Sequence, residues 1–176
     1  MLRTRLLVPA TALALFLATS SLPSGEKQGK DKDAKGGDDT TFVMKASASD
    51  MAEIALGKLA QKKAGSDEVK SFAKHMVDDH TKSSEELKMI AKRKGFALAK
   101  ELDGHHKEMM EKLSKMSGAD FDKAYMSGQV KAHEEAIKLF RKQAKSGEDG
   151  DLRAFANKTL PVIEGHYKQA KQIAGK

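Results

Sequence analysis

The sequence predicts an all-α protein that folds as an antiparallel four-helix bundle, with a broken extra helical segment between the second and third long helices. Apolar residues recur at intervals of three and four over four long stretches, a spacing typical of helices packed in a bundle. Short turns rich in Gly and Ser separate most of these stretches and place consecutive helices antiparallel. No bounded run of alternating apolar and polar residues indicates a strand.

The N-terminus has the layout of a secretory signal peptide at residues 1–20. Arg3 and Arg5 precede the apolar run Leu6–Ala18, and small residues around Ser20 suit cleavage after that residue. The run is shorter than the roughly 20 residues that span a membrane. An uncleaved N-terminal anchor is the alternative. We expect an exported protein of the periplasm or cell envelope, with no transmembrane span after signal cleavage.

The charge pattern argues against nucleic acid as a partner. The formal net charge is +7 and falls to +5 without residues 1–20, which contain two Arg and no acid. The many Lys are interspersed with Glu and Asp, which is typical of a solvated surface, and no Arg cluster with interleaved aromatic residues is present. Weak association with anionic envelope surfaces remains open, and the sequence identifies no protein partner. The absence of Cys excludes disulfides and thiolate ligands.

The bundle domain is predicted to cover residues 40–176, after a disordered linker at 21–39 that is rich in Gly, Lys and Asp. Thr40 or Thr41 is a suitable N-cap for the first helix, which ends at Gly65. We call the stripe of each helix that faces the core its seam. The first seam consists of Phe42, Ala46, Ser49, Glu53, Leu56 and Ala60.

The second helix is predicted from the N-cap Ser66 to Lys94, where Gly95 ends it. Its seam consists of Val69, Phe72, Ala73, Met76, His80, Ser83, Leu87 and Ile90. A short helix over 102–116 follows and is interrupted at Ser117–Asp120.

The two remaining long helices are predicted over 119–145 and 151–173. Pro161 lies inside the last one, so we expect either a kink or two shorter helices there. The two seams consist of Phe121, Tyr125, Gln129, His133, Ile137, Phe140 and Ala144, and of Leu152, Phe155, Thr159, Val162 or Ile163, His166, Ala170 and Ile173.

Each long helix has a polar residue near the middle of its seam. In an antiparallel hairpin, residues equidistant from the turn lie side by side. On this basis Glu53 and His80 lie within about one helical turn of each other in the first hairpin, as do His133 and His166 in the second. If the two hairpins pack with their midpoints level, all four residues meet.

Three imidazoles and a carboxylate are a competent ligand set for a divalent transition metal such as Zn, Fe, Mn or Cu. We therefore predict a metal site for storage, sensing or stress protection. The alternative is an envelope structural or interaction module in which the same residues form only a buried hydrogen-bonded layer. The predicted ligands are Glu53, His80, His133 and His166, with Asp79 and Gln129 as outer partners that orient them.

The sequence does not indicate nucleophilic catalysis, because it has no Cys and no Ser in a nucleophile-elbow or triad context. An enzyme with a mononuclear metal centre is a third possibility. His105 and His106 are each followed four residues later by a methionine, Met109 and Met110, a pattern that suits copper(I). The alternative is that these methionines pack into the bundle and the histidines face solvent.

Five segments together are typical of one bacterial family: Ala52–Gly57, Phe72–His80, Phe121–Tyr125, Gln129–His133 and Leu160–His166. Through them the chain resembles an exported family known as domain of unknown function 4142, over about residues 41–173. The resemblance implies an envelope location, often labelled outer-membrane, and a ferritin-like four-helix bundle, but no established reaction.

The chain departs from the ferritin-like di-iron pattern, in which Glu-x-x-His supplies ligands from two of the helices. Val77, Val130 and Ile163 stand three residues before the three seam histidines, where that pattern requires Glu. We therefore do not expect a di-iron centre of the ferroxidase type.

Overall fold

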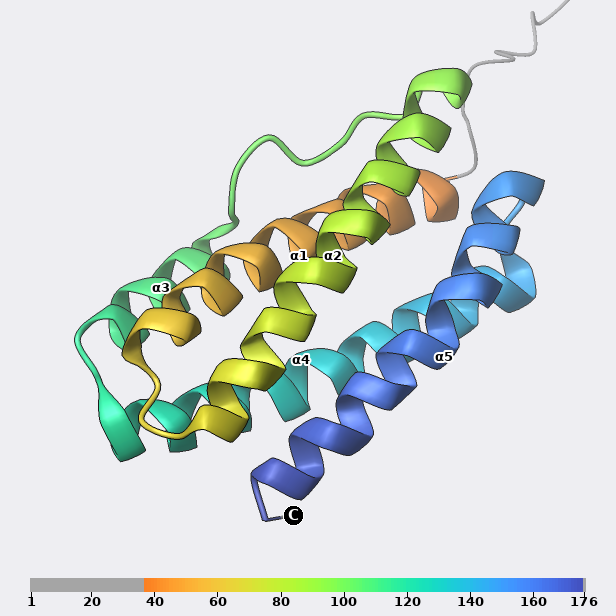
Figure 1. The fold of residues 1–176 in the computed structure, drawn as a ribbon. Coiled ribbons are helices and arrows are strands. Elements are labelled where there is room, and N and C mark those ends of the chain that lie inside the picture. The colour runs from red at the N-terminus through yellow and green to blue at the C-terminus, as the bar shows by residue number, and fades with distance from the viewer. Residues whose placement is uncertain (1–36, 176) are drawn as a thin grey trace, which may run out of the picture. The chain divides into compact units, whose positions relative to one another are not determined.

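The computed structural model describes residues 37–175, so the predicted signal peptide and most of the predicted linker lie outside the described residues. The described chain forms five helices (Figure 1): α1 (Gly37–Lys63), α2 (Asp67–Lys94), α3 (Gly104–Ser114), α4 (Gly118–Ser146) and α5 (Gly150–Ile173). Within 37–175, a single bridge between Ala64 and Gly118 is the only β-type pairing. The all-α prediction is confirmed.

Two helical hairpins make up the bundle. Helix α1 packs against α2 and α4 against α5, while contacts of α1 with α4 and of α2 with α5 join the hairpins. The segment between α2 and α3 runs back along the first hairpin (Figure 1), where the Ala99 N–H donates to Ser47 Oγ at 2.9 Å. Helix α3 then packs against α1 and α4. This is the broken helical segment expected between the second and third long helices.

Local sequence signals set most helix ends. The Ser66 hydroxyl caps α2 by accepting from the Val69 N–H, and Gly95 ends the helix with a φ of 71°. Asp149 caps α5 by accepting from two N–H groups. Helix α5 is continuous through Pro161, so the alternative of two shorter helices is not adopted.

The predicted linker boundary at residue 39 is three residues too late, because α1 begins at Gly37. Asp39 explains the difference. Its buried carboxylate accepts from the Gln143 side chain at 2.8 Å and from the Glu148 and Asp149 N–H groups at 3.1 and 2.7 Å. Composition suggested a solvated segment, but these three donors bind the start of α1 to the α4–α5 turn.

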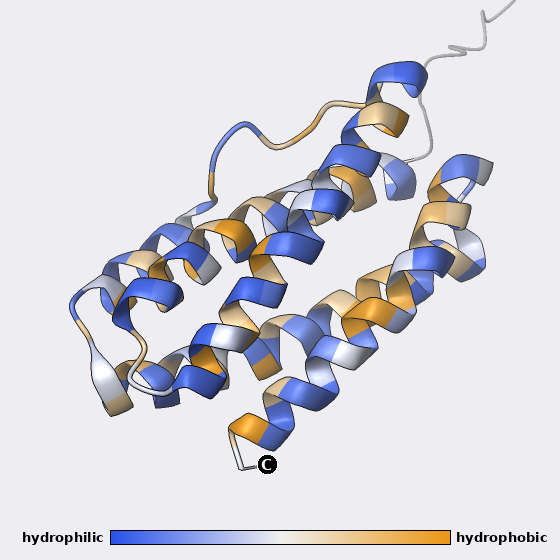
Figure 2. Cartoon of the chain, viewed as in Figure 1, coloured by the Kyte–Doolittle hydropathy of each residue, from blue (hydrophilic) through white to orange (hydrophobic). Residues whose placement is uncertain are grey.

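Every helix combines hydrophobic and hydrophilic residues along its length (Figure 2). The buried hydrophobic residues form two separate clusters. Near the middle of each long helix, buried polar residues separate most residues of one cluster from those of the other, although Val130 of the first cluster follows Gln129. We call these residues the midplane layer: Asp50, Glu53, His80, Gln129, His133 and His166.

The α1–α2 contact depends on Gly57, which lies where the two helices approach closely. A Cβ at this position would stand 2.7 Å from Val77 Cγ2 and 2.9 Å from the Ala73 carbonyl oxygen. Gly57→Ala should therefore lower the free energy of unfolding by about 1–3 kcal/mol, as expected for overpacking. Urea unfolding followed by circular dichroism measures this change.

Gly165→Ala is the matched control, because an added Cβ there meets nothing within 4 Å on α5. It should raise the free energy of unfolding by roughly 0.5–1 kcal/mol, the usual gain of Ala over Gly inside a helix. Equal effects of the two substitutions would contradict the close approach at Gly57.

Candidate metal centre

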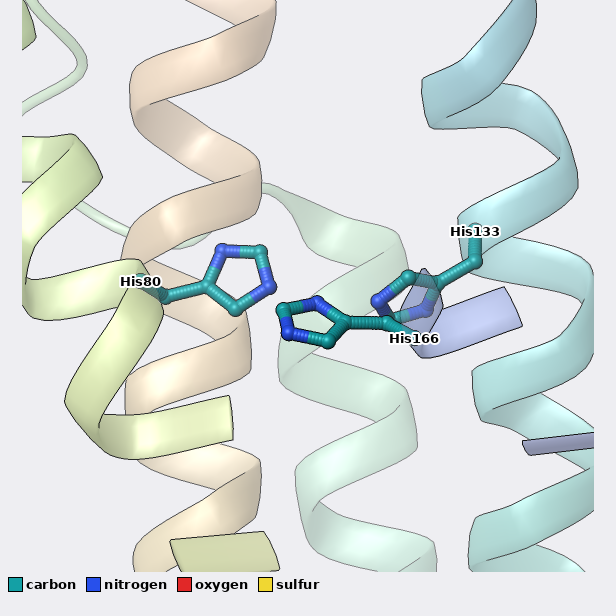
Figure 3. A group of neighbouring side chains, drawn as sticks. All are labelled: His80, His133 and His166. Carbon is teal, nitrogen blue, oxygen red and sulfur yellow. The ribbon is translucent and has the colours of Figure 1, made fainter. Parts of the chain in front are cut away.

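The midplane layer brings three histidines from three helices together. His80 on α2, His133 on α4 and His166 on α5 point toward one another (Figure 3). Their ring centroids are 5.5–6.0 Å apart, and one ring nitrogen from each lies within 4.8 Å of the others. The predicted convergence of these three residues is present in the structure.

The outer side of each ring is held by a hydrogen bond to a fixed partner. His80 Nδ1 lies 2.8 Å from Asp50 Oδ1 on α1, and His166 Nε2 lies 3.2 Å from Asp79 Oδ2 on α2. His133 Nδ1 donates to the Gln129 backbone carbonyl at 2.9 Å. Hydrogen bonds of this kind fix the tautomer and orientation of metal-binding histidines.

The second nitrogen of each ring is buried and has no hydrogen-bond partner among the described residues: His80 Nε2, His133 Nε2 and His166 Nδ1. Because the other nitrogen of each ring faces an acceptor and carries the proton, these nitrogens present lone pairs when the rings are neutral. An unsatisfied buried polar atom costs about 1–3 kcal/mol, so three in one place require an explanation.

The spacing suits a metal after a small adjustment. Two imidazole nitrogens bound tetrahedrally to one zinc ion at about 2.1 Å lie about 3.4 Å apart. The ligand nitrogens of the three histidines now lie within 4.8 Å of one another. Each pair must therefore approach by little more than 1 Å to reach the spacing around one zinc ion.

Burial and acidic neighbours change the pKa values of the three histidine rings in different directions. Burial lowers the pKa of His133, and burial together with His133 and His80 lowers the pKa of His166 to about 4. Burial also opposes the charged form of His80, but Asp50 and Glu53 outweigh it and raise the pKa of this ring. His80 therefore retains its second proton to the highest pH and is the ring whose proton a metal must displace.

Asp50 is the site residue that the sequence prediction missed. It is 4% exposed, and burial raises the pKa of its carboxyl while the hydrogen bond to His80 opposes that rise. The predicted seam used Ser49, because intervals of three and then four run from Ala46 to Ser49 to Glu53. Intervals of four and then three from Ala46 lead to Asp50 and Glu53 equally well.

Glu53 belongs to the midplane layer but not to the group of converging nitrogens. Its Oε2 accepts a hydrogen bond from Gln129 Nε2 at 2.7 Å, and it is 3% exposed. Gln129 thus has two roles, since its backbone carbonyl also orients His133. Asp79 lies beside His166 in the outer position that we predicted, whereas Glu53 acts on His80 and His133 through its charge.

The His105–Met110 motif on α3 does not form a comparable centre. Met109 and Met110 pack against one of the hydrophobic clusters, as the alternative interpretation expected. His106 Nδ1 lies 2.9 Å from Asp103 Oδ2 at the start of the helix.

Comparison with known proteins identifies similar folds but no reaction. The family described as "Domain of unknown function (DUF4142)" matches residues 24–173. A DUF305 fragment from Deinococcus radiodurans superposes with a TM-score of 0.69 at 12% identity, covering 79% of this chain and 96% of that one. A conserved hypothetical protein from Mycobacterium tuberculosis gives 0.60 at 16% identity, covering 81% and 94%.

Among curated proteins, none matches the chain. The two structural similarities establish the fold alone, given their low identity. None of the five helices within 37–175 combines the length and hydrophobicity that crossing a membrane requires.

The metal-free protein should lose stability as the pH falls from 6.5 toward 4. Over this range the unfolded chain takes up a proton at His166 that the folded chain excludes, so the unfolding free energy decreases with decreasing pH. The loss of unfolding free energy is complete once the pH is below the pKa of His166 in the folded protein, and it is on the order of 3 kcal/mol. His166→Gln removes it, so the variant should lose correspondingly less than the wild type in urea titrations with chelator present.

Exposed His105 provides the control for this experiment. His105→Gln should keep the acid sensitivity of the wild type. Identical losses in the wild type and in His166→Gln would show that His166 is not held neutral by the fold.

Proposed function

We propose that this chain, which belongs to the family described as "Domain of unknown function (DUF4142)", is an exported protein that binds one divalent transition metal ion through His80, His133 and His166. The observation that carries the proposal is the direction of the hydrogen bonds. Each ring is bonded outward to a fixed acceptor, and each inward nitrogen has no partner within the described chain. One nitrogen of each of these three rings lies within 4.8 Å of the others.

The alternative of a purely hydrogen-bonded layer is less consistent with this arrangement. A layer that served only to set helix register would pair the histidines with one another or with Glu53, because unsatisfied buried atoms destabilise the fold. Glu53 is instead engaged by Gln129, and the inward nitrogens are left open. A metal ion satisfies all three at once.

The ligand set favours zinc or copper. Imidazole nitrogens suit Zn, Cu, Fe and Ni, and among these divalent ions affinity is higher for Cu²⁺ and Zn²⁺ than for Fe²⁺, whereas Mg²⁺, Ca²⁺ and Mn²⁺ prefer carboxylate, carbonyl and water oxygens. The carboxylates of Asp50 and Asp79 lie behind the rings and not among the converging atoms. In this position they increase the basicity of the imidazoles and compensate the charge of the ion.

Export is the second part of the proposal and rests on the signal-peptide pattern of residues 1–20. A periplasmic or envelope location exposes the protein to metal ions that enter from outside the cell. The centre suits storage, sensing or protection against metal stress. We therefore place the proposed activity in metal handling and not in a defined reaction.

The mature protein should bind one Zn²⁺ or Cu²⁺ ion per chain. His133→Ala should weaken binding by more than about tenfold, because even the loss of an outer partner of a ligand costs 10–100-fold. Isothermal titration calorimetry and elemental analysis of the dialysed protein measure affinity and stoichiometry. Circular dichroism verifies that the variant remains folded.

His75→Ala is the matched control, since His75 lies exposed on α2 and outside the centre. It should leave affinity and stoichiometry unchanged. If the wild type binds no stoichiometric metal, or if His133→Ala and His75→Ala bind it equally, the metal proposal is wrong and the layer is a polar core.

Export can be tested separately by expressing the full chain in a bacterial host and fractionating the cells. The protein recovered from the periplasm should begin at Ser21, as intact-mass spectrometry will show. Replacement of Arg3 and Arg5 by Glu should retain the chain in the cytoplasm, because a signal peptide needs a positively charged start. A full-length wild-type protein in the cytoplasm would contradict the proposal.

A further inference from the structure

An ion that binds at the three histidines must first pass through the wall of the bundle. The two hydrophobic clusters lie on either side of the midplane layer, and their apolar side chains offer an ion no ligand. An ion therefore has to enter sideways, between two helices. His133 on α4 is the most buried of the three histidines, whereas His80 on α2 and His166 on α5 retain slightly more exposed surface. The least covered side of the centre is thus the one between α2 and α5.

The helices are also packed less closely on that side. Helix α2 contacts α5 less extensively than it contacts α1, and α3 packs against α1 and α4 (Figure 1). A cavity of about 20 Å³ borders His80 and His166, and its wall is mainly apolar and includes Phe140, Val162 and Ile163. Such a gap gives neighbouring side chains room to move, because close packing otherwise resists rotamer changes. It is too apolar to hold a hydrated ion.

Asp79 connects this side of the centre with solvent. Of the three residues that accept from the outer nitrogens of the rings, Asp50 and Gln129 are buried, whereas the Asp79 side chain is 36% exposed. Asp79 Oδ1 accepts from the exposed Lys82 ammonium at 3.0 Å, and Oδ2 lies 3.2 Å from His166 Nε2. One carboxylate therefore contacts both a surface cation and a ring of the centre.

Both contacts of Asp79 are exchangeable. The ion pair with Lys82 is exposed, and pairs of this kind contribute little stability. The contact with His166 is the longest of the three that hold the rings, which measure 2.8, 2.9 and 3.2 Å. Carboxylate oxygens are themselves ligands for divalent metal ions. A metal ion arriving from solvent therefore finds its first ligand at Asp79.

We propose that metal ions enter the centre between α2 and α5, and that Asp79 binds them first and transfers them to His166. This inference rests on the proposed metal-binding function. The ion displaces the Lys82 ammonium from Asp79. His166, released from Asp79, binds the ion through its unprotonated Nδ1 and carries it to His80 and His133, and Asp79 then returns to its place behind the ring. No proton is transferred, because the neutral ring keeps its proton on Nε2 throughout.

Binding kinetics distinguish an entry residue from one that only orients a ligand. A carboxylate on the entry route speeds association by attracting the ion, so its removal lowers the association rate constant. A residue that only holds His166 in place acts on the bound state. Its removal leaves association unchanged and raises the dissociation rate constant.

Asp79→Asn should lower the association rate constant for Cu²⁺ by about tenfold, the lower end of the range for electrostatic steering. Asn keeps an oxygen that can accept from His166, so the substitution removes the charge and not the acceptor. The metal-free protein is mixed with excess Cu²⁺ in a stopped-flow instrument, and the quenching of tyrosine fluorescence is followed, since the chain has two Tyr and no Trp. Mixing the copper-loaded protein with excess chelator gives the dissociation rate constant.

Asp78→Asn is the matched control. Asp78 is the neighbouring exposed carboxylate, it pairs with Lys74 on the same helix, and it is not in contact with His166. The substitution changes the net charge equally and should leave the association rate constant near the wild-type value. Raising the ionic strength should slow association in the wild type more than in Asp79→Asn, because salt screens the attraction to the carboxylate.

A second pair of variants tests the route without changing the carboxylate. Lys82→Gln should raise the association rate constant severalfold, because the ion no longer has to displace an ammonium group from Asp79. Lys74→Gln removes the same charge from the pair with Asp78 and should have little effect. Circular dichroism verifies that all four variants are folded.

Copper stoichiometry is measured on the same samples, so the two proposals can fail separately. If all proteins bind one Cu²⁺ and Asp79→Asn associates as fast as Asp78→Asn, the metal proposal stands and the entry route is wrong. A rate for Lys82→Gln no higher than that for Lys74→Gln would overturn the route in the same way. If the wild type binds no Cu²⁺, both proposals are wrong.

Discussion

The structure depends on the hydrogen bonds that cross between helices in the midplane layer. His80 bonds to Asp50 and so joins α2 to α1, while His166 bonds to Asp79 and joins α5 to α2. Gln129 bonds to Glu53 and joins α4 to α1. The last two contacts link one hairpin to the other. A slip of either hairpin by one helical turn, about 5.4 Å, would break both and leave buried polar groups unpaired. Register is therefore fixed by a few polar contacts, while the hydrophobic clusters supply most of the burial.

The hydrophobic clusters and the two ends of the bundle protect the midplane layer from solvent, and this determines how strong its hydrogen bonds are. Each cluster excludes water from one side of the layer, and in such surroundings a hydrogen bond is electrostatically stronger and an unpaired group more costly. Asp39 closes one end by accepting from the α4–α5 turn, and Asp122 closes the other by accepting from the Gly65 and Ser66 N–H groups. Carboxylates that accept from backbone N–H groups thus hold both connections in place. The layer lies in a protected interior, and a small cavity beside α5 is lined by two of its histidines, His80 and His166.

The sequence was sufficient for the fold and for most of the layer, because both follow from periodicity. Helix caps at Ser66 and Gly95 and polar residues at mid-seam are visible without coordinates, and equal distance from the second turn correctly placed His133 beside His166. Side-chain direction was not predictable. Ser49 and Asp50 fit the seam of α1 equally well, and only tertiary packing selects Asp50 as the partner of His80. Glu53 fits a ligand position by spacing, but its carboxylate is engaged by Gln129, a contact between residues 76 positions apart. The start of α1 was missed for a similar reason, since the partners of Asp39 lie in the distant α4–α5 turn.

The contacts that fix the register also determine what the centre can bind. Because each outer acceptor holds one nitrogen of its ring, the opposite nitrogens must face inward, and the fold retains three unsatisfied atoms that it cannot pair by itself. Val77, Val130 and Ile163 occupy the positions from which the carboxylates of a di-iron pattern would bind, so the ion that we propose would be a single one. A ligand that binds only the folded state stabilises it. An ion bound as we propose would therefore stabilise the same contacts that hold the two hairpins in register, and metal occupancy and bundle stability would form a single linked equilibrium.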